Sequence, residues 1–121
     1  YLPVRLEHLQ CNYIKLEKLP SLPNSLRVLE CDYCKITSLP QKLPPNLQEL
    51  ICNSNYVTSL PSNLPSNLQK LICCSNELRS LPDDLPDSLI ELRCDGNRLR
   101  NLPTHLPHNL KILAALDRRC I

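Results

Sequence analysis

Hydrophobic residues recur along this chain with a period of 21 residues, and polar residues and prolines fill the positions between them. The repeated unit is L-x-x-L-x-C-x-x-N-x-L-x-x-L-P-x-x-L-P-x-x. A fixed period of this length is typical of repeat proteins, in which each unit stacks on its neighbours to bury a common core. An amphipathic helix is excluded, because proline occurs twice in each unit. The pattern therefore predicts a solenoid.

Six units can be aligned over nearly the whole chain. They start near Leu6, Leu26, Leu47, Leu68, Leu89 and Leu110. The connection between the first two units is one residue shorter than the others, which a connecting segment tolerates because the strand register need not change. The sixth unit drifts from the pattern, with Ala115 in the cysteine position and Arg118 in the asparagine position.

This pattern resembles the leucine-rich repeat. The resemblance implies a curved right-handed coil, in which each L-x-x-L-x-C segment adds a short strand to a parallel β-sheet on the concave side. It also implies that the leucines and the cysteine point inward, and that the asparagine binds buried backbone groups at the turn. Asn55, Asn76 and Asn97 should form such a ladder. Other residue types occupy this position near the two ends: Ile14, Cys34 and Arg118.

The second half of each unit, L-P-x-x-L-P-x-x, predicts convex segments with little or no helix. Proline fixes φ and lacks an amide proton, which favours extended or polyproline-II geometry. A unit of this length also leaves little room for a helix. Five regular strands at a spacing of about 4.8 Å would make a sheet roughly 20–25 Å wide.

The short unit with two L-P pairs is similar to the repeats of bacterial effectors that are injected into host cells, including the secreted ubiquitin-ligase group. It also resembles repeat proteins of large DNA viruses of amoebae, in which cysteine often fills the inner position.

The chain begins at Tyr1 without an initiator methionine or a signal-peptide pattern. We therefore expect residues 1–121 to be one leucine-rich-repeat domain and a fragment of a longer chain.

The chain has eight cysteines, an even number that would suit a disulfide framework. Five of them share the inner position of successive units: Cys11, Cys31, Cys52, Cys73 and Cys94. Neighbours in this file should lie about 4.8 Å apart with parallel Cβ directions, whereas a disulfide needs Cβ atoms about 3.8 Å apart. We interpret them as buried free thiols, which indicates a reducing compartment. The expected location is cytoplasmic, with the host-cell cytoplasm or a virus particle as possible settings.

No catalytic, metal or cofactor site is expected. Cys31 and Cys34 form a single C-x-x-C motif without a second pair of ligands, and zinc needs about four ligands. Cys74 should face outward on the sheet, but His8 is the only histidine expected on that face, about 14 Å away. A nucleophilic cysteine needs a base within hydrogen-bond reach. A single glycine also cannot build a phosphate-binding loop, so we predict that the chain is not an enzyme.

The formal net charge is +2, from 14 basic and 12 acidic residues that are mixed along the chain. This balance predicts no strong attraction to nucleic acid. No apolar run approaches the roughly 20 residues of a membrane span, so membrane insertion is not expected either. The acidic run Asp83, Asp84 and Asp87 and the arginines near the C-terminal end have their simplest interpretation as solvated surface charge.

With the scaffold fixed by repetition, function should lie in the strand positions that face outward. Ile51 and Ile72 should lie side by side at the centre of the concave sheet, with Glu30 and Arg93 on either flank. An apolar centre with a charged rim is typical of protein-binding patches. The predicted partner-binding positions in these strands are Val28, Glu30, Glu49, Ile51, Lys70, Ile72, Glu91 and Arg93. Tyr13 and Tyr33, expected to be neighbours along one edge, complete the set.

The function expected from the sequence is a noncatalytic interaction module that holds another protein on its concave face, with no small-molecule substrate. One alternative is the substrate-recognition arm of a larger enzyme, such as a ubiquitin-ligase effector. Another is a structural component of a large assembly, such as a virus particle. A catalytic domain in the flanking sequence would favour the first alternative over the interaction module.

Overall fold

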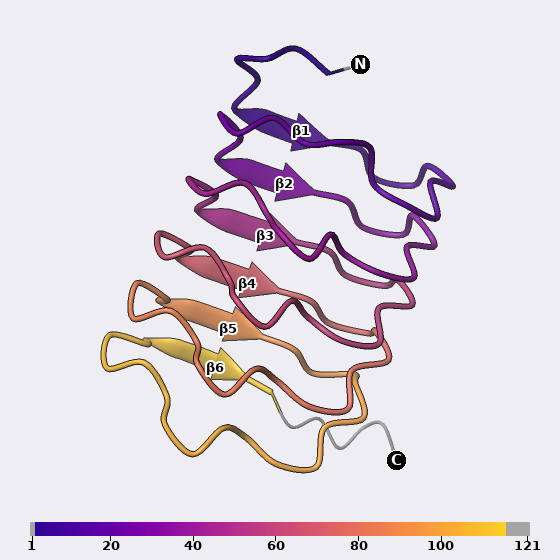
Figure 1. Ribbon diagram of the computed structural model, residues 1–121. Coiled ribbons are helices and arrows are strands. Elements are labelled where there is room, and N and C mark those ends of the chain that lie inside the picture. The colour runs from indigo at the N-terminus through magenta and orange to yellow at the C-terminus, as the bar shows by residue number, and fades with distance from the viewer. Residues whose placement is uncertain (1, 116–121) are drawn as a thin grey trace.

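The computed structural model describes residues 2–115, which form a solenoid with one parallel sheet (Figure 1). The sheet has six strands in the order β1 to β6, so every strand pairs with its neighbours in the sequence. The strands are β1 (His8–Gln10), β2 (Val28–Glu30), β3 (Glu49–Ile51), β4 (Lys70–Ile72), β5 (Glu91–Arg93) and β6 (Ile112–Ala114). Residues 2–115 contain no helix. The predicted parallel solenoid is confirmed.

The middle residue of each strand is a leucine that faces the core. Leu50 pairs in register with Leu71 of the next strand, and both are fully buried. Because side chains alternate along a strand, the residues on either side of these leucines point away from the core. The 21-residue period thereby places equivalent residues of successive units next to each other.

The core is built from files of similar aliphatic side chains that stack along the axis of the solenoid. The first leucine of the unit is fully buried at Leu26, Leu47, Leu68 and Leu89. The cysteines of the inner position are buried as well, with Cys31, Cys52, Cys73 and Cys94 at most 1% exposed. Burial of one leucine side chain contributes roughly 1.5–3 kcal/mol. The core needs no Phe, Trp or Met, which the chain lacks, because neighbouring units supply the volume that one large side chain would fill.

The predicted asparagine ladder is confirmed. Asn76 Nδ2 donates to the backbone oxygens of Cys52 (3.0 Å) and of Cys73 and Cys74 (both 3.2 Å), while its Oδ1 accepts from the Val57 N–H (3.1 Å). Each amide therefore satisfies groups in its own unit and in the unit before it. Asn55 and Asn97 make the equivalent bonds. Buried backbone groups without partners would be costly, so this ladder holds consecutive turns together.

The asparagine position is not simply interrupted at Cys34, as the sequence suggested. Its thiol donates to the backbone oxygens of Cys11 (2.8 Å) and Asp32 (3.3 Å), which correspond to acceptors of the asparagine amides. A thiol lacks the carbonyl oxygen of an asparagine, and the Leu16 N–H instead binds the backbone oxygen of Cys34 (3.0 Å). Ile14 does leave the ladder, and its side chain is exposed. Arg118 lies outside the described residues.

The residue that precedes the asparagine position adopts the left-handed conformation in five units. Tyr13, Tyr33, Ser54, Ser75 and Gly96 have φ between 56° and 75°. The N–H groups of the first four bind backbone oxygens of the following unit at 2.8–3.1 Å, which extends the parallel ladder beyond the strands. The left-handed region is unfavourable for residues other than glycine. The inter-unit bonds therefore hold two tyrosines in a conformation that they rarely adopt.

The proline segments lead into the strands through a turn that recurs in every unit. The carbonyl of the second proline accepts a hydrogen bond from the leucine N–H three residues later, as between Pro44 and Leu47 at 3.2 Å. Proline can occupy this position because it supplies only a carbonyl oxygen there. Residues 2–115 have neither helix nor strand in these segments, as the proline pattern predicted.

The sheet has one more strand than the five regular units predicted. β6 forms although the sixth unit departs from the pattern, because its backbone pairs with β5 from Ile112 to Ala114. Leu113 occupies a core position but remains 41% exposed, since β6 is paired with one strand among the described residues. The later positions of this unit, from Leu116 onward, and the arginine pair Arg118 and Arg119 lie outside the described residues.

Candidate protein-binding surface

The strand residues on either side of each core leucine form a face of the sheet that points away from the core, termed here the outer sheet face. All eight predicted partner-binding positions of the strands lie on it, in β2 to β5. None of them is buried: Val28, Glu30, Glu49, Ile51, Ile72, Glu91 and Arg93 are partly exposed and Lys70 is exposed. The structure therefore brings the predicted residues together on one continuous surface.

Ile51 and Ile72 form the apolar centre of the outer sheet face. They pair in register between β3 and β4, and both are partly exposed. Glu30 pairs with Ile51 on one side, and Arg93 pairs with Ile72 on the other. The predicted order, with two neighbouring isoleucines between two charged residues, is therefore confirmed.

Charged side chains lie on both sides of this centre, and two pairs of charged groups are in contact. Glu49, Lys70 and Glu91 pair in register and alternate in sign across three strands. The Glu91 carboxylate accepts a hydrogen bond from Arg93 Nε at 2.6 Å and raises the pKa of that guanidinium. At the N-terminal end, His8 Nε2 lies 3.4 Å from the Glu30 carboxylate. Orienting contacts of this kind fix the position of charges that a partner would meet.

A second polar ladder runs beside the outer sheet face, one residue after the cysteine position. Asn12 Oδ1 accepts from the Asp32 N–H (2.8 Å), Asp32 Oδ1 from the Asn53 N–H (2.7 Å), and Asn53 Oδ1 from the Cys74 N–H (2.8 Å). The sequence analysis assigned no structural role to this row. The recurrence of Asn or Asp at this position in four of the first five units was the available signal.

The ladder reverses at Cys74, which the sequence placed on the outward side of the strand. The thiol is only half buried, and it donates to Asp95 Oδ1 at 3.1 Å. Burial is the main cause that raises the Cys74 pKa to about 12, and the hydrogen bond to the Asp95 carboxylate raises it as well. A thiol with such a pKa stays protonated at neutral pH, and the thiolate is the nucleophilic form. Cys74 therefore has the role of a hydrogen-bond donor in this arrangement.

The inner cysteines are also held as neutral thiols. Burial raises the pKa of Cys11 to about 11 and that of Cys52 to about 12. The pKa of Cys31 is raised further by burial and by Cys52. All seven cysteines among the described residues are free thiols. The surroundings of the inner cysteines resemble those of small apolar core residues, which was the interpretation from the sequence.

Tyr13 and Tyr33 stack on each other at the edge of the sheet. Their ring centroids are 4.9 Å apart and the rings are within 6° of parallel. The rings nevertheless remain 77% and 54% exposed. The sequence prediction that they are neighbours is confirmed. Exposed aromatic rings that are already ordered lose little conformational entropy on binding, which suits them as interface anchors.

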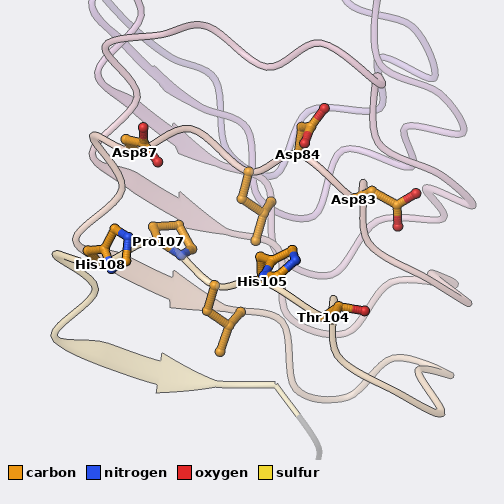
Figure 2. Close-up of a pocket in the computed structure, with 9 residues that line it drawn as sticks. Asp83, Asp84, Asp87, Thr104, His105, Pro107 and His108 are labelled. Carbon is orange, nitrogen blue, oxygen red and sulfur yellow. The ribbon is translucent and has the colours of Figure 1, made fainter.

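A hollow of about 360 Å³ lies between the proline segments of the fourth and fifth units (Figure 2). Asp83, Asp84 and Asp87 come from one segment, and His105 and His108 come from the next (Figure 2). Carboxylates and imidazoles are metal ligands in general. However, residues 2–115 contain no group of three such side chains with a geometry that could hold a metal ion.

Residues 2–115 include no helical segment with the length and hydrophobicity of a membrane span. Within the same residues, His8 belongs to β1 and Cys74 follows β4, three strands away. His8 contacts Glu30 instead, so the structure does not pair Cys74 with His8 as a nucleophile and a base.

The fold is similar to that of a solved protein, YopM from Yersinia enterocolitica WA-314. The TM-score is 0.90 at 36% sequence identity, and the match covers 96% of this chain. The chain spans only a quarter of the length of YopM, since 25% of that protein is covered. No protein-family model and no curated protein sequence matches the chain. The similarity thus concerns the repeat architecture, which extends over nearly all of the sequence.

Proposed function

We propose that this chain, a short-repeat leucine-rich-repeat solenoid, is a noncatalytic module that binds a partner protein on its outer sheet face. The fold follows from the parallel sheet, the 21-residue period and the match to YopM. Solenoids of this kind are usually scaffolds for protein interaction, because consecutive strands present variable side chains on a fixed surface. The choice of face and the residues that bind are our proposal.

The apolar pair Ile51 and Ile72 is the single observation that carries the proposal. Their side chains are partly exposed and pair in register, and they lie between Glu30 and Arg93 on the outer sheet face. Interfaces commonly combine a desolvated centre with a polar rim. The isoleucines would lose water on binding, while the rim charges would select the partner and set its orientation.

The remaining predicted positions extend this surface. Val28, Glu49, Lys70 and Glu91 lie on the same face as the isoleucines, where Glu49, Lys70 and Glu91 offer alternating charges. Tyr13 and Tyr33 supply ordered aromatic area at its edge. We place the module in a reducing compartment such as the cytoplasm, because buried neutral thiols form part of its core.

Site-specific photo-crosslinking followed by affinity measurement tests the proposal. A photoreactive residue at position 72 should crosslink a partner from the native lysate, and the same group at the exposed Ser62 of a proline segment should not. The double variant Ile51→Glu, Ile72→Glu should then weaken binding of that purified partner by at least about a hundredfold. The melting temperature should stay close to that of the parent protein, because both side chains point away from the core.

Two controls separate loss of binding from loss of structure. Gln41→Glu, Ser62→Glu adds the same charge one repeat apart on exposed positions of the proline segments, and it should leave binding unchanged. Leu50→Glu places a charge in the buried core and should unfold the solenoid. A double isoleucine variant that melts normally and binds as tightly as the parent protein would refute the proposed site.

A further inference from the structure

One lateral edge of the solenoid carries a concentration of positive charge. This basic edge consists of the residues on either side of the unit's third leucine position, which lies two residues after the asparagine position, together with Lys18. Its cationic members are Lys15, Lys18, Lys35, Arg79, Arg98 and Arg100. Of the 14 basic and 12 acidic residues of the chain, this edge has six basic residues and only two acidic ones, Glu17 and Glu77. The remainder of the chain has eight basic and ten acidic residues, so the charge is segregated.

Backbone hydrogen bonds align the edge residues of consecutive units. The N–H groups of Tyr56, Glu77 and Arg98 each donate to a backbone oxygen of the preceding unit, at 2.8–2.9 Å. The acceptors are the oxygens of Ile36, Val57 and Leu78, respectively. The Thr37 N–H, two residues later in its unit, binds the Glu17 oxygen at 3.3 Å. These backbone hydrogen bonds join each unit to the next, so the basic edge is an ordered surface over the first five units.

The C-terminal part of the edge is a hollow of about 500 Å³ lined by Arg79, Arg98 and Arg100. Arg98 forms an ion pair with Glu77 at 3.1 Å. Among residues 2–115, no carboxylate lies within 4.0 Å of a side-chain nitrogen of Arg79 or Arg100. Guanidinium groups present several N–H donors in a plane and bind carboxylates with two parallel hydrogen bonds.

The N-terminal part of the edge is a second hollow, of about 460 Å³. Its lining is Leu16, Glu17, Lys18, Lys35, Thr37 and Tyr56. The aliphatic and aromatic surface between two ammonium groups differs from the all-arginine hollow. Lys35 and Arg98 are three units apart, which is about 14 Å at a strand spacing of about 4.8 Å. An extended peptide covers that distance with four or five residues at about 3.3 Å each.

We propose that the basic edge binds an acidic, extended segment of a protein. Carboxylates at both ends of a stretch of four or five residues would meet the two hollows, and apolar residues between them would contact Tyr56. A polypeptide fits better than a nucleic acid, because Glu17 and Glu77 lie among the cations and would repel a continuous row of phosphates. This inference does not depend on the outer sheet face.

Fluorescence anisotropy with the peptide Glu-Glu-Pro-Leu-Pro-Glu-Glu tests the inference on the chain of 121 residues. Binding should be detectable at low ionic strength and should weaken as salt is added. The neutral peptide Gln-Gln-Pro-Leu-Pro-Gln-Gln should not bind. The variant Arg79→Glu, Arg100→Glu should bind the acidic peptide about tenfold more weakly. Both substituted side chains are exposed, and an unchanged melting temperature would establish that the fold is retained.

The control variant Lys42→Glu, Lys111→Glu changes the net charge equally at exposed positions outside the basic edge, and it should bind like the parent protein. Equal loss in this control would attribute binding to net charge and overturn the inference, as would absence of binding or equal binding of the neutral peptide. Tighter binding of an oligothymidine of equal charge would indicate a nucleic-acid ligand and would also overturn the inference. Loss in Ile51→Glu, Ile72→Glu alone would assign the peptide to the outer sheet face.

Discussion

The thiol of Cys34 donates a hydrogen bond to the backbone oxygen of Cys11 at 2.8 Å, from the position that asparagine occupies in the next three units. The equivalent donor in the third unit is Asn55 Nδ2, which binds the backbone oxygen of Cys31 at 2.9 Å. A different side chain thus supplies the same inter-unit contact. The donor for this contact can therefore come from a thiol as well as from an amide.

Replacement of Cys34 by alanine should destabilise the protein by about 1–3 kcal/mol, because the backbone oxygens of Cys11 and Asp32 would lose a buried donor. Cys34→Asn should be better tolerated than Cys34→Ala, since an amide restores the donor. Denaturant unfolding of the two variants beside the parent protein measures the difference. Equal destabilisation by both changes would mean that Cys34 contributes through packing alone.

Asn76→Ala should be more damaging, with a loss of at least about 2 kcal/mol, because one amide satisfies three backbone oxygens and one N–H group. Asn63→Ala is the matched control, since Asn63 lies exposed in a proline segment and should change stability by less than about 0.5 kcal/mol. The free energy of unfolding from denaturant titration distinguishes the two. Similar small effects would contradict the role assigned to the asparagine ladder.

Asp32→Asn should raise the melting temperature at neutral pH. Burial raises the pKa of the Asp32 carboxyl, despite its hydrogen bond from the Asn53 N–H. A raised carboxyl pKa means that the folded state disfavours the charged form, so Asp32 costs stability at pH 7 and less as the pH falls through its pKa. Asparagine keeps the acceptor oxygen and is already present at Asn12 and Asn53. The gain should therefore shrink in acid; a gain that is independent of pH would exclude this cause.

Alkaline pH should destabilise the solenoid through its inner thiols. The pKa of Cys11 is raised to about 11 and that of Cys52 to about 12, from 9.0. The folded protein thus keeps protons that the unfolded chain releases, so this stability is complete below pH 9 and is lost as the pH rises from 9 toward 12. A fully buried thiol contributes up to about 1.4 kcal/mol per pH unit in that window.

Unfolding free energies measured between pH 8 and pH 10.5 test this dependence. The slope should be smaller for Cys52→Ala than for the parent protein, although the variant is less stable at pH 8. An unchanged slope would show that other groups, such as lysine or tyrosine, cause the alkaline loss. In the same samples, a thiol reagent should react slowly with the native protein and rapidly after denaturation.

The sequence alone determined the features that depend on the period. In a solenoid, nearly every contact joins a residue to its equivalent one unit away, so the 21-residue repeat fixes the register, the inward files and the asparagine ladder. For that reason the adjacency of Ile51 and Ile72 and the pairing of Tyr13 with Tyr33 could be predicted without coordinates. The strand of the sixth unit was underestimated, because backbone pairing to β5 does not require the consensus side chains.

Only the tertiary structure decided the roles that depend on the direction of a hydrogen bond or on convergence of different positions. Whether the thiol of Cys34 replaces an amide, and whether Asp32 and Asn53 form a ladder, depends on where backbone oxygens and N–H groups point. The hollow lined by Arg79, Arg98 and Arg100 combines positions on both sides of an inward residue in two units. The repeat predicts which equivalent residues of successive units are neighbours. Which charged side chains from different positions of the unit come together depends on side-chain conformation.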